Sequence, residues 1–79
     1  MSPDQIRDLM NQCLSRQGKA IVQNDSQSLQ ELGFRSLDFS ELALRVEDGL
    51  GRELAFDASD LRSIQTVGDV LALFTRAGA

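Results

Sequence analysis

The chain has 79 residues and a formal net charge of −4, with 25% charged and 42% apolar residues. This length predicts a single domain, residues 1–79, with room for one small core. One cysteine and no histidine exclude a disulfide framework within the chain and a zinc cluster of the usual kind. The sequence also lacks an export signal and any apolar run near the ~18 residues of a membrane span. We therefore expect a cytoplasmic monomer that does not bind nucleic acid.

The first segment predicts an amphipathic helix over about residues 3–17. Ser2, followed by a proline and by Gln5, is a capping-box start, and Gly18 is a stop signal. Between them lies an apolar stripe at helical spacing, made of Ile6, Leu9, Met10, Cys13 and Leu14. Because the cysteine lies within this stripe, we expect its thiol to be buried and inert.

Residues 18–35 are rich in Gln, Asn, Asp and Ser and predict a long connection. Ser28 with Glu31 can cap one short helical turn before Gly33. A connection of this length in a compact domain needs apolar side chains that pin it to the core. We expect the pins to be Ile21, Val22, Leu29, Leu32 and Phe34.

The strongest pattern predicts a helix over about residues 36–50, which the close pair Gly49 and Gly51 ends. Its apolar stripe predicts a buried face formed by Phe39, Leu42, Ala43, Val46 and Leu50. The opposite face places two leucines among carboxylates, in the set Leu37, Glu41, Leu44 and Asp48. Leucines on a solvated face need a reason other than packing, and contact with a partner protein supplies one.

The last third of the chain predicts two further helices. Asp57 can cap a brief helix over about residues 58–63, and Thr66 with Asp69 begins a last helix over about residues 67–77. No alternating pattern of strand length occurs. We therefore predict an all-α bundle of three main helices and one short helix, with the long loop between the first two.

Negative charge is concentrated in one part of the chain. Residues 36–60 hold seven acidic and two basic residues, whereas the rest of the chain holds five acidic and six basic residues. This excess would steer the region toward basic patches on partner proteins, although a solvated face is the plainer interpretation.

Ser36 allows two interpretations. Serine is a preferred N-cap, worth ~1 kcal/mol, and that role alone would account for it. The unpaired N–H groups and the dipole of a helix start also favour an anion, so a phosphate ester on its hydroxyl would be stabilised. The chain has no histidine to activate this hydroxyl, and no acid/base pair or G-x-S-x-G elbow is visible. We therefore do not expect an enzyme.

Five short motifs follow one another along the chain: Leu32-Gly33, Ser36-Leu37-Asp38, Glu41-Leu42, Glu47-Asp48 and Thr66-Val67. In these motifs the sequence resembles the acyl carrier protein family. The resemblance implies the four-helix bundle of that family and an apolar interior that shelters a short acyl chain. It also implies a 4′-phosphopantetheine arm, which Ser36 receives from coenzyme A and which holds fatty acyl or polyketide-type intermediates as thioesters.

The resemblance further implies a set of partner enzymes. These are a phosphopantetheinyl transferase and acyl-loading or acyl-processing enzymes, such as a ketosynthase, an acyltransferase or an adenylating ligase. They would dock on a surface formed by Arg35, Leu37, Asp38, Glu41, Leu44, Glu47, Asp48, Phe56 and Ile64.

One position departs from the family pattern. Most carriers of fatty acid and polyketide pathways have an aspartate directly before the serine, where this chain has Arg35. We expect this arginine to pair with the phosphodiester of the arm and to require an acidic or neutral patch on cognate enzymes. The Gly33-Phe34 pair favours a polyketide-type carrier, because the Gly-Gly pair usual in peptidyl carriers is absent.

Three alternatives remain at this point. The chain could be an aminoacyl or peptidyl carrier, a helical protein–protein adaptor without a prosthetic group, or a domain switched by phosphorylation of Ser36. The initiating Met1 and the compact ends favour a free-standing protein over an excised module.

Overall fold

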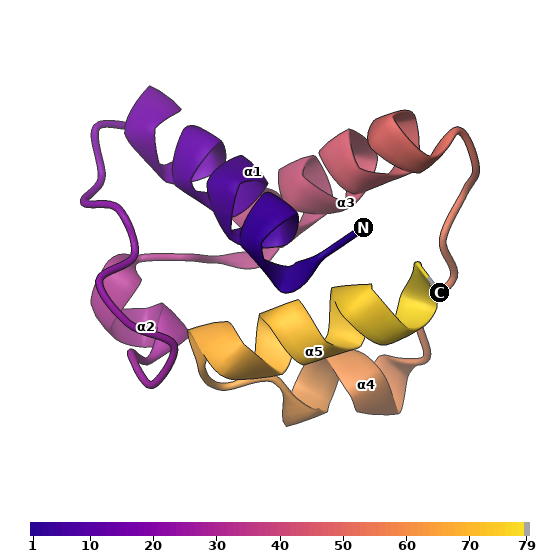
Figure 1. The fold of residues 1–79 in the computed structure, drawn as a ribbon. Helices are drawn as coiled ribbons and strands as arrows, with labels where there is room; N and C mark the ends of the chain where they lie inside the picture. Colours follow the sequence, from indigo (N-terminus) through magenta and orange to yellow (C-terminus); the bar gives the residue numbers. More distant parts are fainter. Residues whose placement is uncertain (79) are drawn as a thin grey trace.

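The computed structural model describes residues 1–78, which form five helices and, within that range, no sheet. The helices are α1 (Pro3–Arg16), α2 (Leu29–Leu32), α3 (Ser36–Leu50), α4 (Ala58–Ser63) and α5 (Val67–Ala77) (Figure 1). The predicted all-α class is confirmed. The one-turn helix α2 adds a fifth element to the predicted four, and it has the predicted cap, because Ser28 Oγ accepts the Glu31 N–H at 3.0 Å.

Two helices begin with the predicted capping boxes. At the start of α1, Ser2 Oγ accepts the Gln5 N–H at 3.2 Å, and Gln5 Oε1 accepts the Ser2 N–H at 2.8 Å. At the start of α5, Thr66 Oγ1 accepts the Asp69 N–H at 3.2 Å, and the Asp69 carboxylate accepts the Thr66 N–H at 3.1 Å. These reciprocal bonds satisfy backbone donors that a helix start leaves unpaired.

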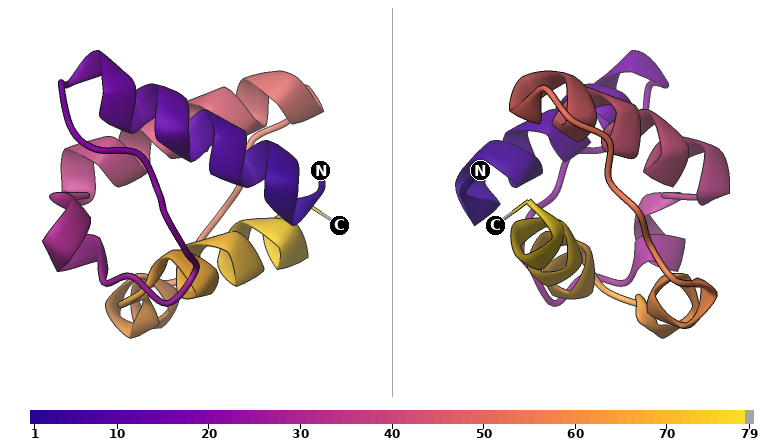
Figure 2. Two further views of the ribbon diagram at one scale, coloured as in Figure 1. Left: turned by 60° about the vertical axis from the view of Figure 1, so that its left-hand side comes forward. Right: turned by 90° about the vertical axis from the view of Figure 1, so that its right-hand side faces the viewer.

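The connection between α1 and α2 is held by backbone and side-chain bonds. It runs beside the start of α5, where Leu29 N–H donates to the Gln65 carbonyl at 2.9 Å and Gly68 N–H donates to the Asp25 carbonyl at 2.8 Å (Figure 2). The Asp25 carboxylate also binds the Arg7 guanidinium of α1 at 2.9 Å. Four of the five predicted pins are buried, but Ile21 is 45% exposed, so its predicted role was wrong.

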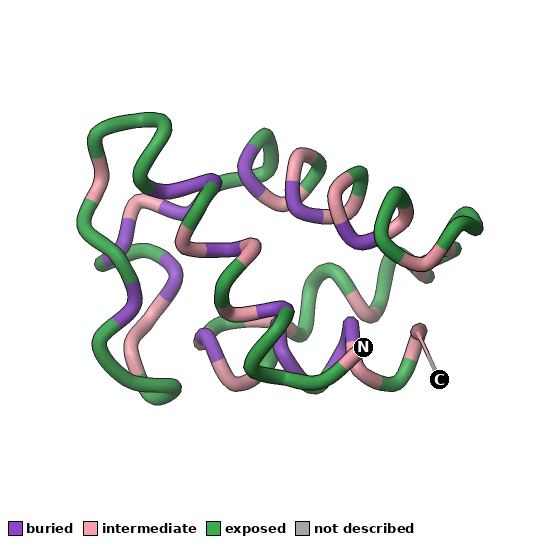
Figure 3. Tube along the Cα trace, turned by 45° about the horizontal axis from the view of Figure 1, so that its top comes forward, coloured by how far each residue is buried: buried purple, intermediate pink, exposed green. Residues whose placement is uncertain are grey.

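The helices surround one core, to which α1 is central. Helix α1 packs against both α3 and α5, and buried segments face inward along each of them (Figures 1 and 3). From α3, the predicted stripe supplies Leu42 and Val46, both fully buried, and three partly buried residues pack beside them. Helix α4 has no buried residue. No helix in the described part of the chain has the length and apolar character that crossing a membrane requires.

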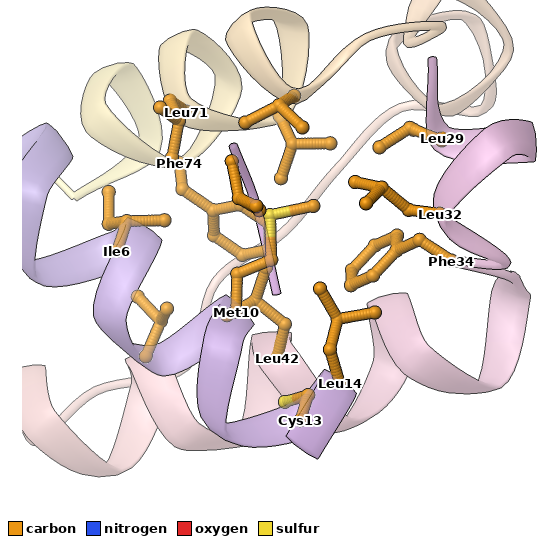
Figure 4. Close-up of a cluster of buried hydrophobic side chains, with 14 residues drawn as sticks. Ile6, Met10, Cys13, Leu14, Leu29, Leu32, Phe34, Leu42, Leu71 and Phe74 are labelled. Carbon is orange, nitrogen blue, oxygen red and sulfur yellow. The ribbon is translucent and has the colours of Figure 1, made fainter. Parts of the chain in front are cut away.

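The core is filled by aliphatic, sulfur-containing and aromatic side chains (Figure 4). Cys13 lies among them at 0% exposure, and burial raises the pKa of its thiol. A thiol that stays protonated is a poor nucleophile, which agrees with the expectation of an inert cysteine.

We predict that Leu42→Ala lowers the free energy of unfolding by about 2–5 kcal/mol, because it leaves a cavity where the side chain is 0% exposed. Leu44→Ala is the matched control on the same helix. Its side chain is 66% exposed, so the change there should stay within about 0.5 kcal/mol. Urea denaturation followed by circular dichroism measures both. Equal losses for the two variants would contradict this packing.

Candidate functional site

The chain turns sharply into α3. Gly33 ends α2 in the left-handed conformation, with φ 72° and ψ 23°, which glycine adopts without a Cβ penalty. Arg35 then takes the N-cap position, and Ser36 is the first residue of the helix. The backbone N–H of Arg35 is bound by the Asp38 carboxylate at 2.7 Å. Interpreting Ser36 as a plain N-cap was therefore wrong, because the residue before it occupies that position.

Ser36 is exposed, as are its neighbours Arg35 and Leu37. Its hydroxyl lies at the positive end of a helix of 15 residues, where unpaired backbone N–H groups and the helix dipole favour negative charge. Beside it is an open groove of ≈ 410 Å³, lined by Leu29, Gln30, Gly33, Phe34, Arg35, Ser36 and Ile64. The site thus combines an accessible hydroxyl, a cation and a partly apolar groove.

Asp38 is buried beneath this turn and holds it through hydrogen bonds. Its side chain is 2% exposed. The carboxylate accepts hydrogen bonds from the Gln17 side chain, from Lys19 Nζ at 3.0 Å and from the Arg35 N–H. Lys19 Nζ also donates to the Gly33 carbonyl at 2.5 Å. The prediction that Asp38 contacts partner enzymes was wrong, because the carboxylate joins the end of α1 and the following loop to the start of α3.

The network also controls the charge of Asp38. Burial alone would raise the pKa of the Asp38 carboxyl, because it disfavours the charged form. The hydrogen bonds from the Arg35 backbone and from Gln17 and Lys19 outweigh that effect and hold the pKa below its usual value. The carboxylate therefore stays ionised, and its attraction to Lys19 persists, throughout the neutral range.

The outward face of α3 is less acidic than its sequence predicts. The two predicted leucines, Leu37 and Leu44, are 85% and 66% exposed. The Glu41 carboxylate, however, pairs with Arg16 of α1 at 3.1 Å and with Arg45 at 3.3 Å.

Two other predicted docking residues of α3, Glu47 and Asp48, differ in how exposed they are. Glu47 is partly buried and accepts the Leu54 backbone N–H at 2.7 Å, which ties the loop after α3 to the helix. Asp48 is exposed and borders a surface groove formed by Arg16, Glu41, Leu44, Arg45 and Asp48. Sequence reasoning did not place Arg16 in this groove, because Arg16 lies on another helix.

The two candidate residues near α4 are partly buried. Ile64 lines the groove beside Ser36. Phe56 instead turns its ring to Phe39 and Phe74, with centroid separations of 5.6 and 5.2 Å. Its main contacts are therefore with the core.

Comparison with known proteins decides the family. A family model described as "Phosphopantetheine attachment site" matches residues 4–74, which is most of the chain. The chain belongs to this carrier protein family. Domains of the family are the site of covalent 4′-phosphopantetheine attachment.

A solved structure has the same fold. An acyl carrier protein from Thermotoga maritima matches with a TM-score of 0.72 at 22% sequence identity, covering 98% of this chain and 91% of that one. At this identity the likeness shows the fold alone. No curated protein matches the chain. Carrier domains of this family are not catalytic, and they interact with transferases and acyl-processing enzymes.

We predict that Asp38→Asn destabilises this carrier domain by about 1–3 kcal/mol near neutral pH, because Lys19 loses a buried charged partner. The folded pKa of Asp38 lies below its unfolded value of about 3.9. Its stabilisation is therefore fully present above that value and is lost as the pH falls through the folded pKa. The difference between the two proteins should shrink in acid.

Urea denaturation over a pH series measures this difference. Asp8→Asn is the matched control, because it removes the same charge from an exposed position on α1. A stability difference for Asp38→Asn that stays constant down to the acid range would show that the charge of Asp38 contributes nothing.

Proposed function

We propose that Ser36 is the residue to which 4′-phosphopantetheine is attached, and that the protein carries acyl intermediates as thioesters on that arm. The observation that supports this most directly is the state of the hydroxyl. Ser36 is exposed at the first position of α3. The N-cap residue is Arg35, whose backbone N–H is bound by the Asp38 carboxylate, so the helix start does not use the Ser36 hydroxyl. The hydroxyl is thus free to react without cost to the fold.

The attachment step balances as a phosphoryl transfer. Ser36 Oγ forms a bond to the pantetheine-bearing phosphorus of coenzyme A, the pyrophosphate bond breaks, and adenosine 3′,5′-bisphosphate leaves. The hydroxyl proton must go to a base, and the chain has no histidine to act as one. The phosphopantetheinyl transferase therefore supplies the base, which agrees with a carrier that is not itself an enzyme.

The residues at the site fit the group. A phosphodiester on Ser36 would lie in the positive field of the α3 start, and the exposed Arg35 guanidinium is the adjacent cation. The groove bordered by Phe34 and Ile64 offers the adjoining chain a partly apolar surface. When bound, the arm supplies a terminal thiol that carries the cargo as a thioester.

Partner enzymes would dock on the outward face of α3. Leu37 and Leu44 are its apolar contacts, Arg35 lies at the Ser36 end and Asp48 at the far end. The partners would be the transferase and acyl-loading or acyl-processing enzymes, in a cytoplasmic fatty acid or polyketide pathway. A surface with few apolar anchors and exposed charges supports weak, salt-sensitive docking, which suits a carrier that must leave each enzyme.

We predict that the protein gains the mass of one phosphopantetheine when it is incubated with coenzyme A and a broad-specificity transferase. Ser36→Ala should gain none, whereas Ser40→Ala, which removes another exposed hydroxyl of α3, should gain it fully. Intact-protein mass spectrometry reads all three. A wild-type protein that gains no mass would overturn the proposal and favour an adaptor that uses the same leucines without a prosthetic group.

We also predict that Arg35→Asp changes loading rates by about tenfold or more with at least some members of a transferase panel, because it reverses the charge beside the hydroxyl. Arg76→Asp is the matched control, with an equal charge change on an exposed residue in the last turn of α5. Initial loading rates at low and high salt measure the effect. Rates equal to wild type for every transferase would remove Arg35 from the docking surface.

A further inference from the structure

One surface groove joins α1 to the outward face of α3. It has a volume of ≈ 450 Å³, and the residues that line it are Arg16 of α1 and Glu41, Leu44, Arg45 and Asp48 of α3. Leu44 is 66% exposed and offers an apolar contact among four charged side chains. The groove therefore suits a ligand that has both an apolar and a charged part.

The two arginines of the groove have more N–H donors than the chain gives them acceptors. A guanidinium is a planar fork of N–H donors and has no acceptor of its own. Arg16 Nη1 and Arg45 Nη2 donate to the same oxygen, Glu41 Oε1, at 3.1 and 3.3 Å, and Arg45 Nη1 donates to Gln12 Oε1 at 3.0 Å. Arg45 Nε is buried and has no partner in the described part of the chain. The pair of guanidiniums is therefore short of anionic acceptors.

The Arg16 guanidinium has a whole edge open to solvent. Its side chain is 67% exposed, against 25% for Arg45, and among residues 1–78 its Nε and Nη2 have no hydrogen-bond partner. The same edge of Arg7 binds the Asp25 carboxylate, with Nε at 3.2 Å and Nη2 at 2.9 Å. An arginine edge of this kind matches the two oxygens of a carboxylate. Arg16 can therefore receive from outside the group that Arg7 receives from within the chain.

We propose that this groove is part of the docking surface, and that it binds a carboxylate side chain of a partner enzyme. The carboxylate would bind the open edge of Arg16, and an apolar side chain beside it would lie against Leu44. This inference rests on the proposed function of Ser36, because it names the chemistry of the enzymes that approach that residue. It makes Arg16, on a different helix from Ser36, a residue that determines partner specificity.

The groove lies within reach of an enzyme that contacts Ser36. Leu44 and Leu37 are seven residues apart and share one face of α3. At the rise of an α-helix, Leu44 is about 12 Å along the axis from Ser36. An interface of ordinary size covers about 800 Å² on each partner and spans more than this distance. A lysine or arginine of the enzyme at the groove would meet like charges, so the groove also rejects partners.

The test compares loading by two phosphopantetheinyl transferases of known structure. The acidic transferase has carboxylates on the surface around its coenzyme A entrance, and the basic transferase has lysines and arginines there. At low salt, Arg16→Glu should raise the KM of the acidic transferase for the carrier by about tenfold or more. Its kcat should change less than about twofold, because the variant leaves Ser36 in place. The KM of the basic transferase should stay the same or fall. Initial rates of mass gain at a series of carrier concentrations measure these constants.

Arg76→Glu is the matched control. It makes the same change in net charge on an exposed residue, also in the last turn of a helix, so it should leave both KM values within about twofold of wild type. Leu44→Ala removes the apolar contact and should raise the KM of the acidic transferase. High salt should shrink the effect of Arg16→Glu but not that of Leu44→Ala.

Circular dichroism checks that each variant is folded, and Arg16→Gln, which only removes the charge, replaces Arg16→Glu should that variant not fold. The inference fails if the acidic transferase has the same KM for Arg16→Glu as for wild type or for Arg76→Glu. It also fails if only the basic transferase loads the wild type. Absence of any mass gain with both transferases would instead refute attachment at Ser36, and this inference with it.

Discussion

The attraction between one buried carboxylate and its three donors fixes the rest of the site. Asp38 is taken out of water, and a buried charge left unpaired costs several kcal/mol. The chain avoids that cost only when Gln17 from the end of α1, Lys19 from the loop and the Arg35 backbone converge on the carboxylate. Because these donors come from separate segments, they set the position of α3 relative to α1. The hydroxyl of Ser36 is placed as a consequence.

This interaction also explains where sequence reasoning succeeded and where it failed. Local signals predicted the helices well, because a capping box such as that of Ser2 is complete within four residues. The role of Asp38 was hidden, since its side-chain donors Gln17 and Lys19 lie 21 and 19 positions away. On a helical wheel Asp38 lies at the border of the apolar stripe, four residues before the buried Leu42, and the wheel does not show which donors reach its carboxylate. Only tertiary structure shows that a lysine covers it.

The same limit applies to charge. Counting acidic residues predicted a strongly negative face on α3, but Glu41 is paired with Arg16 and Arg45, and Glu47 binds a backbone N–H of the following loop. Both carboxylates therefore already have partners within the chain. What the face offers to a partner is two leucines and a few remaining charges of both signs. As the proposed docking surface, this face would discriminate between partners by the placement of individual charges more than by net charge.

Rigidity is distributed unevenly around the site, and this determines which element a partner can recognise. Helix α3 buries Leu42 and Val46, whereas α4 has no buried residue and is flanked by the partly buried Phe56 and Ile64. A helix held only at its ends has a low free energy of local opening. Phe56 is held by ring contacts with Phe39 and Phe74, so the placement of one end of α4 depends on these aromatic contacts. In the proposed docking, a partner would therefore meet a firmly packed surface on α3 and a less tightly held one at α4.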